Sequence, residues 1–197
     1  MNENFIPTDE DKKNFLEEDF AYEVELLCFS FTKLIEFKNA DGRYPQSSSY
    51  FTDVSTGWVP PQYGHQTVDR NNVNMALETF LLHARNLVEF FYTKHKKYST
   101  DVRALDFFEN KGSWIGSRPN LTGSLTKIRE RAGKELAHLT YKRISGTPPE
   151  KDWSTGETVE DLVKVINIFL DRLPPKYIGE RLRNLPPRIA PYRSLLR

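Results

Sequence analysis

The sequence predicts an all-α protein, a four- to five-helix bundle with a long irregular loop after the first helix and a proline-rich C-terminal tail. Four segments repeat apolar residues at spacings of three and four, which is the period of an amphipathic helix. No series of segments alternates apolar and polar residues as the strands of a sheet do. We therefore expect a single bundle domain over residues 1–173, with a loop inserted at 39–69, and a basic tail at 174–197.

The first helix is expected from near Asp9 to about Phe37. Acidic residues in its first turns suit the positive end of the helix dipole. Its apolar residues fall on one face, which we expect to be buried: Phe20, Val24, Leu27, Phe31, Leu34 and Ile35.

Glycines, prolines and three consecutive serines predict the irregular loop at 39–69, with room for a short hairpin around Tyr50–Val59. The loop carries more aromatic rings than a free linker would: Tyr44, Tyr50, Phe51, Trp58 and Tyr63. We expect it to pack on the bundle or on a partner.

The second helix, about Asn71–Lys97, has the clearest apolar periodicity of the chain, running from Val73 to Phe91. A short helix at Val102–Phe108 is expected after it, with Leu105 packed inward.

The third helix is expected from Pro119, which suits a first helical position, to about Arg143. The fourth fits Gly156–Leu173, with Thr155 or Thr158 as its cap, and it ends at two consecutive prolines. The third helix has this buried stripe: Leu121, Leu125, Ile128, Ala132, Leu136 and Leu139. The fourth helix is expected to bury a stripe of its own: Val159, Leu162, Val163, Ile166, Phe169, Leu170 and Leu173.

Cys28 is the only cysteine among the 197 residues. An intramolecular disulfide and a cysteine-rich metal site are therefore excluded, which fits a reducing compartment. No secretory signal begins the chain, and no apolar run approaches the roughly 18–20 residues that span a bilayer. We expect a cytoplasmic protein without a membrane partner.

The net charge of +1 conceals opposite charges at the two ends of the chain. Residues 1–36 hold ten acidic residues against three lysines, whereas residues 171–197 hold seven basic residues against Asp171 and Glu180. A basic tail can bind nucleic acid or an acidic partner. We favour the other interpretation, in which the two ends attract each other within the molecule or across a dimer.

The usual motifs of cofactor-dependent and hydrolytic enzymes are missing. The chain has no glycine-rich phosphate loop and no serine-centred nucleophile elbow. Its histidines include no His-x-x-x-His pair of the kind that binds zinc: His65, His83, His95 and His138. We expect no metal and no other cofactor, which leaves metal-free chemistry.

The third helix has a polar stripe opposite its apolar one: Arg131, Lys134, Glu135, His138, Tyr141 and Lys142. Arg131 and His138 are seven residues apart, so they lie on nearly the same face, two turns apart. The imidazole of His138 can exchange protons near neutral pH, and the planar guanidinium of Arg131 can hold a phosphate. The alternative is a solvated helix face on which the histidine has no function.

Arg131, six intervening residues and His138 resemble the Arg-x(4–6)-His motif of the HEPN superfamily. The resemblance covers roughly residues 71–173. It implies a bundle of four or five helices, often in a toxin or phage-defence protein, whose two protomers line one cleft with both motifs. Active members are metal-independent ribonucleases that use the His and the Arg on the scissile phosphate. Other members are binding or scaffold modules.

The segment His83–Phe91 also resembles an early bundle helix of bacterial proteins of this kind. The resemblance implies that Arg85 and Asn86 support the cleft or the dimer, and that Lys134, Tyr141 and Lys142 assist substrate binding. The simpler alternative makes Arg85 and Glu89 a surface ion pair one turn apart.

Three functions follow from these observations. The most specific is a homodimeric, metal-independent endoribonuclease with His138 as general acid and base and Arg131 on the phosphate. The second is a non-catalytic helical module that binds a protein partner through loop 44–63 or tail 174–197. The third is a protein that binds RNA or DNA through the arginines of the tail, without chemistry. Whether the chain is an enzyme at all stays open at this point.

Overall fold

The computed structural model describes residues 6–37, 64–136 and 153–185, and of residues 64–71 and 133–136 it describes the backbone alone. Within these ranges every regular element is a helix and none is a strand, which confirms the all-α fold. The expected hairpin at 50–59 lies outside the described residues.

The first helix begins where the sequence predicts and runs through three consecutive parts. These are α1 (Asp9–Phe15), the π-helical stretch η1 (Leu16–Phe20) and α2 (Ala21–Glu36). Thr8 caps its start, because Thr8 Oγ1 accepts the backbone N–H of Asp11 at 3.1 Å and Asp11 Oδ2 accepts that of Thr8 at 2.8 Å. The expected apolar stripe faces the core, with Phe20, Val24 and Leu27 at most 2% exposed.

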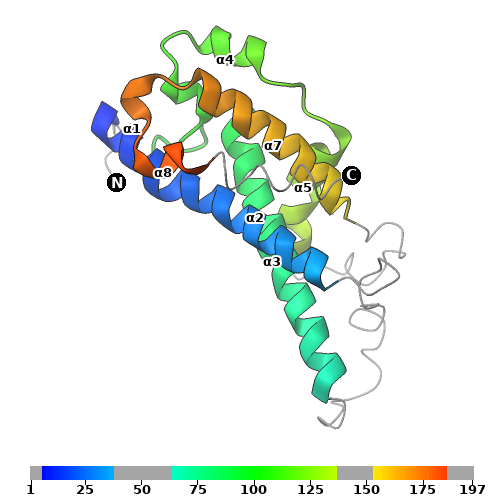
Figure 1. The fold of residues 1–197 in the computed structure, drawn as a ribbon. Coiled ribbons are helices and arrows are strands. Elements are labelled where there is room, and N and C mark those ends of the chain that lie inside the picture. The colour runs from blue at the N-terminus through cyan, green and yellow to red at the C-terminus, as the bar shows by residue number, and fades with distance from the viewer. Residues whose placement is uncertain (1–5, 38–63, 137–152, 186–197) are drawn as a thin grey trace.

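The second long helix, α3 (Gly64–Tyr92), is displaced toward the N-terminus relative to its prediction. Its first turns extend beyond the end of α2, where no apolar stripe is required (Figure 1). It ends at Tyr92 instead of Lys97, because side chains further along the chain bind its last carbonyls. Phe91 O accepts the indole N–H of Trp114 at 3.4 Å and a guanidinium N–H of Arg118.

Two short helices follow α3. The 3₁₀ helix η2 (Ala104–Phe107) lies inside the predicted Val102–Phe108 and buries Leu105. The helix α4 (Lys111–Ser117) has no counterpart in the prediction; Asn110 caps it and Trp114 anchors it in the core at 0% exposure.

The third long helix, α5 (Gly123–Leu136), starts four residues later than Pro119. Arg118 precedes the proline with an extended backbone (ψ 145°), as residues before proline prefer, and the chain becomes helical only after Thr122. Thr122 O accepts the N–H of Thr126 at 2.9 Å. Leu125, Ile128 and Ala132 are buried as expected, and the predicted end near Arg143 lies outside the described residues.

The helix α7 (Thr155–Arg172) matches the predicted fourth helix, but neither threonine is its cap. Ser154 occupies the cap position, while Thr155 and Thr158 lie within the first turn at 7% and 2% exposure. The two prolines after Leu173 end the helix as predicted.

Phe169 on α7 is the centre of the core. Its ring lies within 6.0 Å, centroid to centroid, of rings from four other segments of the chain. These rings are Phe20, Phe90, Phe91, Phe107, Phe108 and Trp114. Edge-to-face packing of this kind adds to the stabilisation that burial of the rings supplies.

After α7 the chain returns to its beginning. The 3₁₀ helix η4 (Pro175–Tyr177) and the short helix α8 (Glu180–Arg183) lie beside α1 and η1 (Figure 1). The carboxylate of Glu17 accepts the backbone N–H groups of Gly179, Arg181 and Leu182 at 3.0, 2.9 and 3.2 Å. A Cβ at position 179 would have to displace that carboxylate. The expectation that the two ends attract each other within the molecule is confirmed for residues 174–185.

Candidate functional site between α5 and α7

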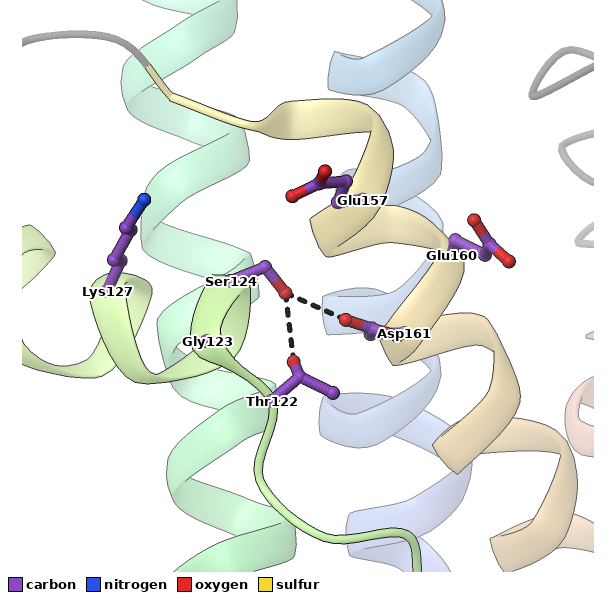
Figure 2. Close-up of a pocket in the computed structure, with 7 residues that line it drawn as sticks. All are labelled: Thr122, Gly123, Ser124, Lys127, Glu157, Glu160 and Asp161. Atoms are coloured by element: carbon purple, nitrogen blue, oxygen red, sulfur yellow. Dashed lines mark hydrogen bonds between the residues drawn. The ribbon is translucent and has the colours of Figure 1, made fainter. Parts of the chain in front are cut away.

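The start of α5 and the first turns of α7 border an open hollow of about 340 Å³ (Figure 2). Thr122, Ser124 and Lys127 line it on one side, and Glu157, Glu160 and Asp161 line it on the other. Ser124, Lys127 and Arg131 are spaced by three and four residues, so they share the flank of α5 that faces α7. The hollow therefore lies at the N-terminal end of the polar stripe predicted from the sequence.

Hydrogen bonds and ion pairs already occupy several groups in the hollow. Ser124 Oγ donates to Asp161 Oδ2 at 2.8 Å and lies 2.9 Å from Thr122 Oγ1 (Figure 2). On the outer side, Lys164 Nζ binds Glu160 at 2.9 Å. Among the described residues, Ser124 thus contacts a carboxylate and a hydroxyl, and no histidine.

Asp161 also influences a tyrosine beneath the hollow. Burial raises the pKa of Tyr92, the guanidinium of Arg118 opposes that shift, and the negative charge of Asp161 adds to it. The guanidinium of Arg118 stacks on the Tyr92 ring at 4.8 Å from its centroid, and the hydroxyl donates to Pro119 O at 3.2 Å. Tyr92 therefore stays protonated near neutral pH and serves a structural role.

Arg131 lies one turn beyond Lys127. Its guanidinium carbon is 4.2 Å from the centroid of the Trp153 ring, in the segment that leads into α7. This cation–π contact fixes the half-buried arginine against an aromatic surface. The backbone of Lys134 continues the helix, but its side chain lies outside the described residues, as do His138, Tyr141 and Lys142 entirely.

The two predicted residues of α3 have other surroundings. Asn86 is exposed and donates to both carboxylate oxygens of Glu23 on α2, each at 3.2 Å. His83, which is 6% exposed, brings Nδ1 to 2.7 Å from the same carboxylate. Asn86 thus contacts Glu23 on α2, whereas Arg131 contacts Trp153, which precedes α7. The structure therefore does not bring Asn86 and Arg131 to a common partner. Sequence reasoning missed the Glu23–His83 pair, because no local pattern joins residues 60 positions apart.

The structure does not contain the ion pair between Arg85 and Glu89 that was the simpler alternative for Arg85. Glu89 pairs with Arg129 of α5, whose Nε lies 3.2 Å from Glu89 Oε1, and accepts a hydrogen bond from Thr93. Within the described ranges no ion pair joins Glu89 to Arg85, which is half-buried on α3. Arg129 and Arg131 therefore point to opposite flanks of α5, one toward α3 and the other toward α7.

The described residues contain neither a cluster of metal ligands nor a membrane-spanning helix. No group of three or more histidine, cysteine or acidic side chains in these ranges could hold a metal ion. None of the described helices combines the length and the apolarity that crossing a membrane requires.

Comparison of the chain with models of known protein families, with curated proteins and with solved structures finds no match.

Proposed function

We propose that the chain is a HEPN-like, metal-independent endoribonuclease that acts as a homodimer in a bacterial toxin or phage-defence system. One observation carries the proposal: Arg131 stands on the α7 flank of α5, stacked on Trp153, one helical turn beyond Lys127, which lines the hollow. His138 follows two turns later in the sequence. The all-α fold supports the same conclusion, because the motif belongs to a helical bundle.

In this proposal, His138 transfers protons at the scissile phosphate and Arg131 binds the phosphate oxygens. The stacking on Trp153 would orient the guanidinium in advance, so that less side-chain freedom is lost when RNA binds. The carboxylates of Glu157, Glu160 and Asp161 would repel a phosphate chain from the hollow itself. We therefore expect the RNA backbone to lie at the end of the stripe that holds Arg131 and Lys134.

The first test is cleavage of end-labelled RNA by the purified full-length chain in the presence of a chelator. Replacement His138→Ala or Arg131→Ala should lower the cleavage rate by about a hundredfold or more, because each removes a group that acts on the phosphate. Arg129→Ala is the matched control, since that arginine sits on the opposite flank of α5 and pairs with Glu89. It should leave the rate unchanged.

Four experimental results would contradict parts of the proposal. RNA that stays intact, or cleavage that survives His138→Ala in a folded protein, would contradict catalysis and leave a non-catalytic helical module as the better explanation. Light scattering tests the homodimer separately, because an active monomer would contradict the shared cleft. Cleavage that stops on chelation would contradict the metal-independent mechanism.

A further inference from the structure

The segment that leaves α3 carries the densest group of basic side chains in the chain. Lys94, His95, Lys96 and Lys97 are consecutive, and no other four consecutive residues of the sequence include three lysines or arginines. Tyr98 follows directly. We call residues 94–98 the basic turn; all of its side chains are exposed except that of Lys96, which is half-buried.

Residues just beyond the basic turn hold its backbone in place. The carboxylate of Asp101 accepts the backbone N–H groups of Lys97 and Tyr98, both at 2.8 Å. The guanidinium of Arg103 donates to Lys94 O at 2.5 Å. The shape of the turn thus comes from Asp101 and Arg103, and the side chains of Lys94 and Lys97 are not needed to form it.

The charges of Lys94 and Lys97 have no carboxylate partner within the described residues. Asp101 is bound to backbone N–H groups, and Asp106 is paired with cations of its own, at 2.7 and 3.2 Å. Over residues 94–106, four lysines and arginines stand against these two acidic residues. The basic turn therefore presents a positive surface.

Neither the end of α3 nor the adjacent α1 explains these charges. Positive charge after a helix can stabilise its last turn through the helix dipole. The last carbonyls of α3 already have donors, however, because Phe91 O binds the side chains of Trp114 and Arg118. From α1, Asp11 and Lys12 lie beside the segment at the small hollow next to it, and their charges cancel.

Tyr98 adds an exposed aromatic ring to this positive surface. The residue is 60% exposed, and among the described residues its ring stacks on no other ring. The ammonium of Lys97 lies 5.2 Å from its centroid. Every nucleic acid base has a flat face that can stack on such a ring, and lysines beside the ring can bind the phosphates that flank the base.

We propose that the basic turn binds single-stranded nucleic acid, with Lys94 and Lys97 on the phosphates and a base stacked on Tyr98. A single strand is required because the bases of a duplex stack on each other and offer no free face to a side chain. The turn shares no residue with the hollow between α5 and α7 and does not include Arg131. It supplies affinity and takes no part in cleavage, so the inference does not rest on the proposed nuclease activity.

The test measures binding of a fluorescent strand to the full-length chain by anisotropy. The strand is a 2′-O-methyl RNA of about 12 nucleotides, within the site sizes of known single-strand-binding folds. It has no free 2′-hydroxyl to attack the phosphate, so binding is measured without cleavage. We expect a dissociation constant on the order of 10–100 μM at about 0.1 M salt. DNA of the same sequence should bind about as well, and the corresponding duplex more weakly.

Matched pairs of lysine variants test the contacts to the phosphates. Lys94→Gln combined with Lys97→Gln should weaken binding about tenfold. It should also reduce the dependence of log affinity on log salt by about 1.4, since each phosphate contact of a single strand contributes about 0.7. Lys33→Gln combined with Lys164→Gln is the control. It removes the same charge from exposed lysines that already have carboxylate partners, and should change affinity less than about twofold.

A tyrosine pair tests the stacking. Tyr98→Leu should weaken binding about fivefold or more, because leucine offers no flat face to a base. Tyr22→Leu is the control; that tyrosine is 50% exposed but lies on α2, and its replacement should leave the affinity unchanged. Circular dichroism would show that both variants fold.

Four results would each overturn the proposal. The first is an absence of binding up to about 1 mM, which is weaker than ordinary non-specific binding. The second is an equal loss of affinity in the two lysine pairs. The third is unchanged binding in Tyr98→Leu, which would leave a surface for any polyanion. The fourth is tighter binding of oligoglutamate of the same charge, which would indicate an acidic protein partner. Cleavage of RNA enters none of these measurements, so the proposed nuclease activity and this site are tested separately.

Discussion

Phe169 shows at the scale of one residue how the core holds segments that are distant in the sequence. Its ring, at 0% exposure, contacts the end of η1, the end of α3, η2 and α4. The sequence predicted that this residue faces inward, from its place in the apolar stripe of α7. It gave no indication that the rings of four other segments would gather around it, because that depends on how the helices cross.

The same substitution at a buried and an exposed phenylalanine tests this role. Phe169→Leu should lower the free energy of unfolding by about 1–3 kcal/mol, because leucine cannot reach all the surrounding rings and leaves a cavity. Phe29→Leu on α2 is the control; that ring is 57% exposed, and its loss should change stability by at most about 0.5 kcal/mol. Urea unfolding followed by circular dichroism measures both, and equal effects would contradict a core organised around Phe169.

Cys28 is a second residue whose environment explains its chemistry. It lies in the apolar face of α2 at 5% exposure, as the sequence predicted. Burial and the nearby charge of Glu25 raise the pKa of its thiol to about 12. The thiolate is the reactive form, so the cysteine is a core residue and not a nucleophile.

At the scale of elements, the turn between α3 and η2 depends on a group of charges that the sequence pattern did not identify. The guanidinium of Arg103 donates to Lys94 O and lies 2.7 Å from Asp106, which in turn lies 3.2 Å from Lys96. Arg103 is only 9% exposed. Burial acts to raise the pKa of Asp106, but the hydrogen bond from Arg103 and the charge of Lys96 outweigh it, so the pKa is lowered.

Asp106→Asn should therefore lower the free energy of unfolding at pH 7 by about 1–3 kcal/mol, because Arg103 keeps its charge without the carboxylate that pairs with it. The stabilisation exists above the usual pKa of 3.8, where both states are ionised. It is lost as the pH falls through the lowered pKa of the folded state, since the unfolded state takes up the proton first. The difference from the unsubstituted protein should thus shrink below about pH 4.

The exposed Asp171, at the end of α7, supplies the control for this experiment. Asp171→Asn should leave stability nearly unchanged, within about 0.5 kcal/mol, at every pH. Chemical unfolding at pH 3, 5 and 7 would make the comparison. A deficit in Asp106→Asn that persists unchanged at pH 3 would show that the charge of Asp106 is not the cause.

The elements that the sequence predicted well are those whose helical period coincides with burial. The stripes of α2, α5 and α7 face the core because each helix is long enough for one face to be recognised. The helix α4 was missed because it has seven residues, two of them glycines, and a single buried anchor, Trp114. The π turn of η1 has no sequence signature; there Arg181 Nη1 reaches the carbonyl of Glu17 at 3.0 Å.

The candidate site also has one part that helical spacing predicts and another part that it does not. The spacing of Ser124, Lys127 and Arg131 on one helix placed them on a common flank, as a helical period requires. The partners of these residues were not predictable, because Trp153 and Asp161 come from another element. Local spacing determines which side chains share a face, but tertiary packing determines what that face meets.

At the scale of the whole molecule, the acidic first helix and the basic C-terminal segment bind each other. Lys176 binds Asp9 at 2.8 Å, and Tyr177 donates to the same carboxylate at 2.6 Å. Arg181 binds Glu25 at 2.8 Å. These basic residues of the tail are engaged with the acidic first helix. Contact between the tail and a nucleic acid would therefore fall to the exposed Arg183 and to the arginines at 188, 193 and 197, the last three of which lie outside the described residues.

Two arginines of α8, two positions apart, test whether this contact joins the ends of the chain. Arg181→Ala should lower the free energy of unfolding by about 1–3 kcal/mol, because it removes the pair with Glu25 and the bonds to the carbonyls of η1. Arg183→Ala should change it by at most about 0.5 kcal/mol, since the side chain of the exposed Arg183 donates, among the described residues, to Ile178 O of its own segment. In 1 M salt the cost of Arg181→Ala should fall but not vanish, because screening weakens the ion pair while the backbone hydrogen bonds remain. Urea unfolding at low and high salt measures all three effects. Equal costs for the two variants would mean that the contacts of the Arg181 side chain do not help to hold the C-terminal segment in place.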